Sequence, residues 1–301
     1  MVKNHVSDKF QLLDGRGHKN YDFVDIAVNN DNLLFIDPVL IELGKDIWSK
    51  DASKYVESYF NMLFEAYYKE DRENIRNLLS HAGEQNATRL GYGKGDNGKG
   101  NTAKGLIETF KPLERLIVDI KSVERVEDLT ILIPGFAEDG LSDLLTNILH
   151  KCLNDFTVAQ MSKQGIYCNG ELEFYTWDVK LKDWVLVKRP SYLVDGKELL
   201  LVPKWIVRSR YLFGVNQYFT RIILERMLDE GWYRDLNGNT IPKKEIIKSK
   251  RFSGEHWIYN ESVKYTAIHN DALDEYHRKI LGFYIEHGKP MSDELLDLII
   301  Y

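Results

Sequence analysis

The 301 residues of this chain are 44% hydrophobic and 29% charged, the composition of a folded protein large enough to bury a sizeable core. A formal net charge of −6 excludes a general attraction for phosphate backbones, so any nucleic-acid site must be local. No apolar run approaches the roughly 18 residues of a membrane span, and the first residues lack the apolar segment of a secretory signal. We therefore expect a cytoplasmic protein without membrane contact.

The first apolar stretch lies at residues 33–41 and contains the pair Asp37 and Pro38. Proline interrupts a strand ladder but fits the first turn of a helix. The pattern therefore predicts a short buried strand that ends near Asp37, then a turn or helix from Pro38. Asp37 has two interpretations: a functional acid, or the N-cap or turn residue that an aspartate before proline more often is.

Residues 54–79 carry apolar and aromatic side chains three and four apart, which predicts an amphipathic helix and then a shorter one. A glycine-rich stretch, residues 91–105, follows. Its spacing approaches that of an NTPase phosphate loop, but Gly100 stands where that motif needs a hydroxyl for magnesium, so we reject an NTPase function. Two hypotheses remain: the stretch brings backbone N–H groups and lysines to a phosphate, or it is a surface loop. Its lysines are Lys94, Lys99 and Lys104.

Residues 103–126 again have helical spacing, and an acidic segment at 134–143 leads into a helix predicted from Ser142 to about Leu153. Asp139 and Asp143 are four residues apart at the start of this helix, so the two carboxylates share one side and could hold a divalent metal. The alternative is structural, because acids at a helix start cap its N–H groups and favour its dipole.

The pattern changes after Gly165, where alternating apolar and aromatic residues predict strands at 172–177, 184–187, 192–194 and 199–202. Asp195 and Gly196 form a typical two-residue hairpin turn, so the last two strands should pair antiparallel. Basic residues gather around these strands and in a later loop, and either group could contact nucleic acid. Acidic residues interleaved with the first group make a solvated sheet face an equal alternative. The first group includes Lys188, Arg189, Lys204 and Arg208, and the second comprises Lys243, Lys244, Lys248, Lys250 and Arg251.

Helical spacing returns in the C-terminal third, at residues 216–230, 272–287 and 291–301. We therefore predict an α+β fold with an antiparallel hairpin or sheet at about residues 171–207, flanked by helices, a helical N-terminal half and a helical C-terminus. The chain is predicted to form one compact unit, residues 1–301, with a helical half (1–126) and an α+β half (127–301). The histidines of this third lack the paired spacing of a zinc site, so none is assigned as a ligand: His256, His269, His277 and His287.

Four short motifs resemble a family of uncharacterised bacterial proteins that often occur in phage-defence settings. In that family they read LFIDP, LGYxKG, GxxxDxISD and LLVPK. Here they stand at residues 34–38, 90–95, 135–143 and 200–204. The likeness spans most of the first two thirds of the chain and leaves out the C-terminal helices. Gly140 stands where a basic residue is expected and Leu141 where isoleucine is expected, so any role of that basic side chain is absent.

The layout is also similar to that of the PD-(D/E)xK nucleases, in which a helix, an acid, a hairpin and an acid-x-lysine strand surround one or two magnesium ions. This resemblance implies that Mg²⁺ would activate a bound water and that a lysine would orient the water or neutralise the phosphorane. It implies Asp139 or Asp143 as the first acid and Lys204 as the lysine. Val202 stands where the second acid belongs, so Asp195 or Glu198 would have to supply it.

Two functions from different classes follow. The first is a metal-dependent nuclease-like effector of anti-phage defence, which hydrolyses phosphodiester bonds of DNA or RNA with Mg²⁺. Its catalytic residues would be Asp139, Asp143 and Lys204, its metal ligands Asp139, Asp143 and Glu198, and its nucleic-acid contacts Lys94, Lys99, Lys104, Lys188, Arg189 and Arg208. The second is a non-catalytic interaction or sensor subunit that binds a partner protein in a multi-gene defence complex. The abundant aromatic residues and the missing acid before Lys204 favour this second function.

Overall fold

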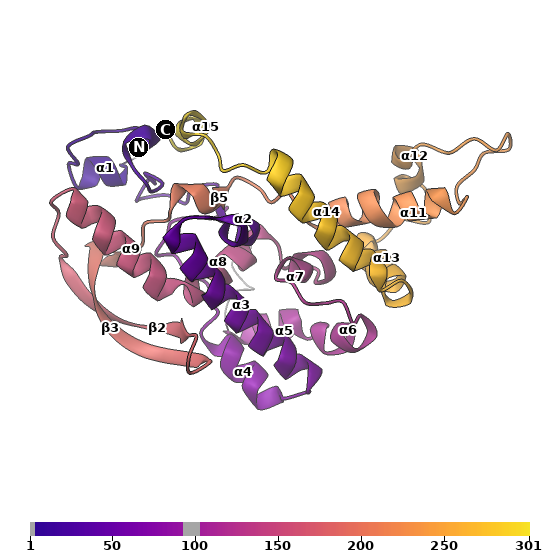
Figure 1. The fold of residues 1–301 in the computed structure, drawn as a ribbon, viewed down its shortest axis with the longest axis horizontal. Helices are drawn as coiled ribbons and strands as arrows, with labels where there is room; N and C mark the ends of the chain where they lie inside the picture. The colour runs from indigo at the N-terminus through magenta and orange to yellow at the C-terminus, as the bar shows by residue number, and fades with distance from the viewer. Residues whose placement is uncertain (1–3, 93–102) are drawn as a thin grey trace.

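The computed structural model describes residues 4–92 and 103–301, in which helices flank a small antiparallel sheet that lies at one edge of the molecule (Figure 1). This arrangement confirms the α+β class and the helical termini predicted from the sequence. The helices before the sheet are α1 (Val6–Lys9), η1 (His18–Asn20), α2 (Pro38–Leu43), α3 (Ile47–Tyr68), α4 (Arg72–Ser80), α5 (Ala103–Phe110), α6 (Leu113–Asp119), α7 (Glu127–Leu132), α8 (Glu138–Ile148) and α9 (His150–Lys163).

Helix α3 is the longest helix of this half and lies at its centre (Figure 1). Asp46 caps its start, because the Asp46 Oδ1 atom accepts a hydrogen bond of 2.9 Å from the backbone N–H of Ser49. The side chains spaced three and four apart along it, such as Tyr59 and Leu63, are buried. The amphipathic helix predicted within residues 54–79 is therefore present, and α4 is the shorter helix that follows it.

The main sheet has the order β2-β3-β4, all antiparallel, with β2 (Gly170–Asp178), β3 (Asp183–Val194) and β4 (Lys197–Leu199). Asp195 and Gly196 both have positive φ, 52° and 79°, as a tight hairpin turn requires, and Tyr192 pairs with Leu199 across it. The predicted turn and antiparallel pairing are confirmed, but the second strand is Lys197–Leu199 where residues 199–202 were predicted. β3 is one long strand where the sequence predicted two. Pro190, which lies between the two predicted strands, pairs with Glu171 of β2, and β4 begins to pair only at Tyr192.

Two tryptophans of this sheet pack against the helices and form hydrogen bonds with them. Trp177 and Trp184 make edge contacts with the ring of Tyr59, with centroids 5.1 and 5.6 Å apart. Trp177 Nε1 donates to Ser58 Oγ at 3.1 Å, and Trp184 Nε1 donates to the Leu78 carbonyl at 2.9 Å. Both indole N–H groups are therefore satisfied inside the core, which fixes the sheet against α3 and α4.

A second, two-stranded sheet joins distant parts of the chain. β1 (Phe35–Ile36) pairs antiparallel with β5 (Val207–Arg208), and Asp37 follows β1 directly. Asp37 Oδ1 accepts hydrogen bonds from Val39 N at 2.9 Å and Leu40 N at 3.4 Å, so Asp37 is the N-cap of α2. The predicted strand, the helix from Pro38 and the capping role of Asp37 are all present.

Helical structure between the glycine-rich stretch and the sheet is divided more finely than the sequence indicated. Residues 127–132, just before the acidic segment at 134–143, form the separate helix α7. The helix predicted to reach Leu153 ends at Ile148, and Leu149, with φ −92° and ψ 9°, separates it from α9. The apolar pattern continues through this break, so it could not reveal the boundary.

The C-terminal third starts with helices that project from one side of the molecule (Figure 1). We call residues 215–287 the C-terminal arm. The last helix returns to the other terminus, where the backbone N–H of Gly17 donates to Tyr301 Oη at 2.8 Å. The elements after β4, apart from β5, are η2 (Lys204–Ile206), α10 (Val215–Tyr218), the π-helix η3 (Phe219–Ile223), α11 (Leu224–Asp229), α12 (Lys243–Ile247), α13 (Trp257–Ile268), α14 (Asp271–His287) and α15 (Asp293–Ile300).

The three C-terminal helices predicted from periodicity are present, although the first is interrupted by a π-helical turn. The loop predicted to carry the second basic group, residues 243–251, contains α12, and α13 was not predicted. Within residues 4–92 and 103–301, no helix combines the length and the apolar character that crossing a bilayer requires.

Candidate functional site

Asp139 lies in the first turn of α8, directly against the start of the glycine-rich stretch. A Cβ atom added to Gly91 would lie only 2.6 Å from Asp139 Oδ1, so a side chain at position 91 would collide with this carboxylate. The backbone of Tyr92 forms a hydrogen bond with the Asp139 carboxylate, and Tyr92 Oη donates to Glu138 Oε2 at 3.0 Å. We call Gly91, Tyr92, Glu138 and Asp139 the acidic junction.

The electrostatic environment of Asp139 disfavours its charged form. Burial raises the pKa of this carboxyl, and the hydrogen bond from Tyr92 lowers it. The negative charges of Asp31, Glu84 and Glu138 raise the pKa further, and the net shift is upward. The carboxylates around half-buried Asp139 repel one another, and a bound cation would reduce this repulsion.

Described parts of three sequence motifs, residues 34–38, 90–92 and 135–143, meet at this place. Ser142 Oγ accepts a hydrogen bond of 3.1 Å from the backbone N–H of Ile36. The ring of Phe35 contacts the ring of Tyr92, with centroids 4.8 Å apart. Tyr211 Oη donates to the Ile36 carbonyl at 2.7 Å and lies 3.2 Å from the Glu138 carbonyl. Three separate segments are therefore held in fixed positions around Asp139.

Asp143 lies one turn after Asp139 on α8 and is buried. Burial raises the pKa of Tyr211 well above its ordinary value, and the negative charges of nearby groups, Asp143 among them, raise it further. Asp139, Asp143 and Glu198 do not form a group whose ligand atoms all lie within 4.8 Å of one another. The assignment of these three residues as one metal site stays a prediction.

Glu198, on β4, is engaged with a histidine. Glu198 Oε2 lies 2.9 Å from His150 Nε2, and the His150 ring stacks on Phe174 with centroids 3.8 Å apart. His150 is buried in α9, so this contact ties the edge of the sheet to a helix. Glu198 therefore has a structural partner in the fold.

Lys204, expected beside a scissile phosphate, contacts one residue near each end of the chain. Its Nζ atom lies 2.7 Å from Asp293 Oδ1 of α15 and donates to the His18 carbonyl at 2.7 Å. These contacts assign Lys204 to the junction between η1, η2 and α15.

The residues predicted to contact nucleic acid have several different environments. Lys94 and Lys99 lie outside the described residues, and Lys104 is exposed in the first turn of α5. Lys188 Nζ lies 2.8 Å from Glu171 Oε2, and Arg189 Nη2 lies 2.5 Å from Asp155 Oδ1. Arg208 is buried, with Nε 3.0 Å from Asp37 Oδ2.

Sequence reasoning missed the neighbours of Asp139, namely Asp31, Glu84, Tyr92 and Glu138. Asp31 and Glu84 are far from residue 139 in the chain, so no spacing rule could bring them together. Tyr92 and Glu138 lay inside stretches already singled out, and only their contact with each other was unknown.

Residues 13–213 match a domain of unknown function, DUF8370, over more than half of the chain. This chain belongs to the DUF8370 family. The matched range contains the acidic junction and the residues predicted as sites, apart from the second basic group at 243–251, and it ends just before the C-terminal arm of this DUF8370 protein. No curated protein and no solved structure matches the chain.

Proposed function

We propose that the acidic junction of this DUF8370 protein is a divalent-metal site at which phosphodiester bonds of DNA or RNA are hydrolysed. The observation that carries the proposal is the half-buried carboxylate of Asp139, which lies against the backbone at Gly91 among other carboxylates that raise its pKa. A hard cation such as Mg²⁺ prefers oxygen ligands and would neutralise this repulsion.

The chemistry assigned to the metal is activation of a bound water and stabilisation of the charge that develops on the phosphate. Asp139 would bind the ion, with Asp143 one turn later as its companion on α8. Exposed Lys104, at the end of the glycine-rich stretch, would contact the phosphate backbone. The proposal assigns no step to Lys204 or Glu198, because both have structural partners. The motif resemblance described above supports a role in anti-phage defence.

The test is a cleavage assay of the full chain on labelled single- and double-stranded DNA and RNA, with Mg²⁺, Mn²⁺ or EDTA. Asp139→Asn keeps the size of the side chain and removes its charge, and it should reduce cleavage by about 100-fold or more. Glu73→Gln, which alters an exposed first-turn acid of α4, is the matched control and should cleave like the wild type. Cleavage that persists in Asp139→Asn, with thermal stability unchanged, would overturn the assignment.

A second candidate function is a non-catalytic interaction or sensor subunit of a defence complex. The specific observation in its favour is that Lys204 and Glu198, the two groups expected beside the metal, are held by Asp293 and His150. On this proposal the folded wild-type chain cleaves none of the substrates, and calorimetric titration with Mg²⁺ gives the same absence of heat for wild type and Asp139→Asn.

A further inference from the structure

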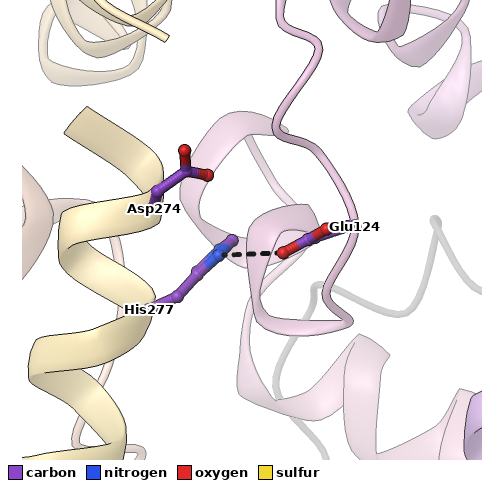
Figure 2. Close-up of side chains that lie close together, drawn as sticks. All are labelled: Glu124, Asp274 and His277. Carbon is purple, nitrogen blue, oxygen red and sulfur yellow. Dashed lines mark ion pairs between the residues drawn. The ribbon is translucent and has the colours of Figure 1, made fainter. Parts of the chain in front are cut away.

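A group of metal-ligating side chains lies away from the acidic junction. Among the residues that the structure describes, Glu124, Asp274 and His277 form the one group of three such residues whose ligand atoms all lie within 4.8 Å of one another. Glu124 comes from the loop before α7, and Asp274 and His277 come from α14 (Figure 2). The spacing of three residues places Asp274 and His277 on the same face of that helix.

His277 supplies the observation that points to a ligand. The residue is only 6% exposed, and its Nδ1 atom has no hydrogen-bond partner. Figure 2 shows the imidazole directed at Glu124, whose Oε1 atom lies 3.8 Å from Nδ1. A buried ring nitrogen without a hydrogen bond is costly unless another group, such as a metal ion, occupies its lone pair.

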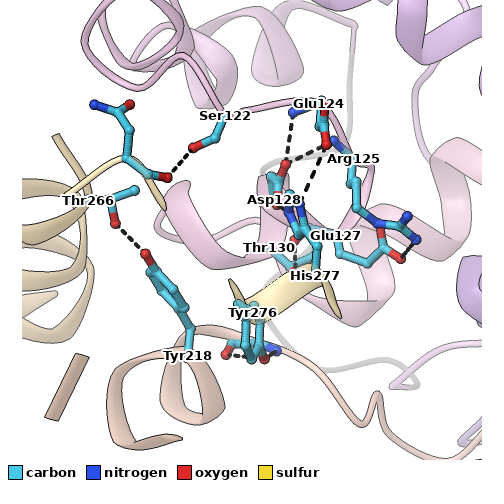
Figure 3. Close-up of polar contacts among 12 residues, drawn as sticks. Ser122, Glu124, Arg125, Glu127, Asp128, Thr130, Tyr218, Thr266, Tyr276 and His277 are labelled. Atoms are coloured by element: carbon cyan, nitrogen blue, oxygen red, sulfur yellow. Dashed lines mark hydrogen bonds and ion pairs between the residues drawn. The ribbon is translucent and has the colours of Figure 1, made fainter. Parts of the chain in front are cut away.

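The other ring nitrogen of His277 is fixed by a buried carboxylate. His277 Nε2 lies 2.6 Å from Asp128 Oδ1, and Asp128 is fully buried (Figure 3). Asp128 Oδ2 accepts hydrogen bonds from the backbone N–H groups of Glu124, at 3.0 Å, and Arg125, at 2.9 Å. A carboxylate only accepts, so Nε2 carries a proton, and Nδ1 is the nitrogen that a metal binds once it is deprotonated. A carboxylate that orients a histidine in this way is the usual support of a metal-binding imidazole.

Arg125, the residue next to Glu124, forms its ion pairs with acids outside this group of ligands. Arg125 forms ion pairs with Glu42 and with Glu127, whose Oε1 atom lies 3.1 Å from Arg125 Nη2. The Glu124 side chain is 71% exposed, so an ion in solution reaches its carboxylate directly. Charge and access therefore both favour a cation at this group.

We propose that Glu124, Asp274 and His277 bind a first-row transition-metal dication, of which Zn²⁺ is the best fit. The shared ion then links the C-terminal arm to the DUF8370 domain. One imidazole nitrogen and two carboxylate oxygens are ligands that Zn²⁺ accepts, whereas Mg²⁺ prefers oxygen alone. Glu124 belongs to the matched range 13–213, and the two other ligands belong to the arm, so the ion joins two parts of the protein.

The experiment uses the full chain after dialysis against EDTA. Titration calorimetry with ZnCl₂ measures affinity and stoichiometry, and hydrogen exchange measures the protection of residues 271–287 before and after the metal. Glu124→Gln and Asp274→Asn remove one ligand charge each without touching the buried His277–Asp128 contact. His287→Gln, on the same helix and exposed, is the matched control.

We expect one Zn²⁺ ion per chain, added protection of α14, and a loss of affinity of about 10-fold or more in each ligand variant but not in His287→Gln. The absence of Zn²⁺ binding, or equal binding by wild type and both ligand variants, would overturn the proposal. Asp139→Asn should keep the Zn²⁺ site, and Glu124→Gln should keep any cleavage at the acidic junction. This site and the proposed function are therefore tested separately.

Discussion

Asp37 and Arg208 form a buried ion pair that joins the beginning of the chain to the end of the sheet region. Arg208 Nε lies 3.0 Å from Asp37 Oδ2, and Asp37 is fully buried. The same carboxylate oxygen accepts a hydrogen bond of 2.7 Å from Tyr284 Oη, and the guanidinium lies over the Tyr284 ring, 5.1 Å from its centroid. One polar cluster therefore connects α2, β5 and α14.

Loss of Asp37 should be strongly destabilising. Asp37→Ala leaves the buried charge of Arg208 without its counter-ion and removes the N-cap of α2, and we expect the free energy of unfolding to fall by about 3–5 kcal/mol. Tyr284→Phe removes one hydrogen bond to the same carboxylate and should cost about 1 kcal/mol. Urea unfolding followed by circular dichroism measures both. Equal losses in the two variants would contradict the importance of the ion pair.

Asp37 should also make stability depend on pH. Burial raises the pKa of Asp37 to about 6, although the hydrogen bond from Tyr284 and the charge of Arg208 lower it. The folded-state pKa exceeds the ordinary value of 3.8, so between these values the folded state holds a proton that the unfolded state has released. The stabilising contribution of protonated Asp37 is therefore full below the ordinary pKa and is lost as pH rises through the folded-state pKa.

The size of this loss should be on the order of 3 kcal/mol. Asp37→Asn keeps the size of the side chain but does not titrate, so its free energy of unfolding should lack this decline over the same pH range. Urea unfolding of both proteins at several pH values measures the difference. A difference between wild type and variant that stays constant with pH would refute the raised pKa.

Gly91 should not tolerate a side chain. Its φ is +135°, and an added Cβ atom would lie 2.6 Å from Asp139 Oδ1, so Gly91→Ala should lower the free energy of unfolding by about 2–3 kcal/mol. Gly15→Ala is the control, because Gly15 has a φ of +67° with no atom within 4 Å of an added Cβ, and it should cost only about 1 kcal/mol. Differential scanning calorimetry compares the two. Similar losses would mean that Asp139 moves away freely.

The contact between Lys204 and Asp293 predicts a structural role for the lysine. A double-mutant cycle with Lys204→Met and Asp293→Asn should give a coupling energy of about 0.5–1 kcal/mol, because both side chains are partly exposed to solvent. Any cleavage by the wild type should survive in Lys204→Met. An inactive Lys204→Met of unchanged stability would instead restore Lys204 to the catalytic role that the sequence suggested.

Local patterns in the sequence determined the elements correctly where neighbours along the chain decide the structure. The periodicity of α3, the tight turn at Asp195, and the capping of α2 by Asp37 all depend on residues within a few positions of one another. Asp139 and the glycine-rich stretch were likewise each singled out by composition.

Only the tertiary structure decided which charged groups meet. Lys204 faces Asp293, Glu198 faces His150, Asp37 faces Arg208, and Glu124 faces His277. Each pair is separated by many residues, and an ion pair requires only that two side chains approach within a few ångströms, which no spacing along the chain encodes. The sequence therefore determined the inventory of reactive groups and their local helices and strands, while packing determined which of them are paired, buried or left to bind a ligand.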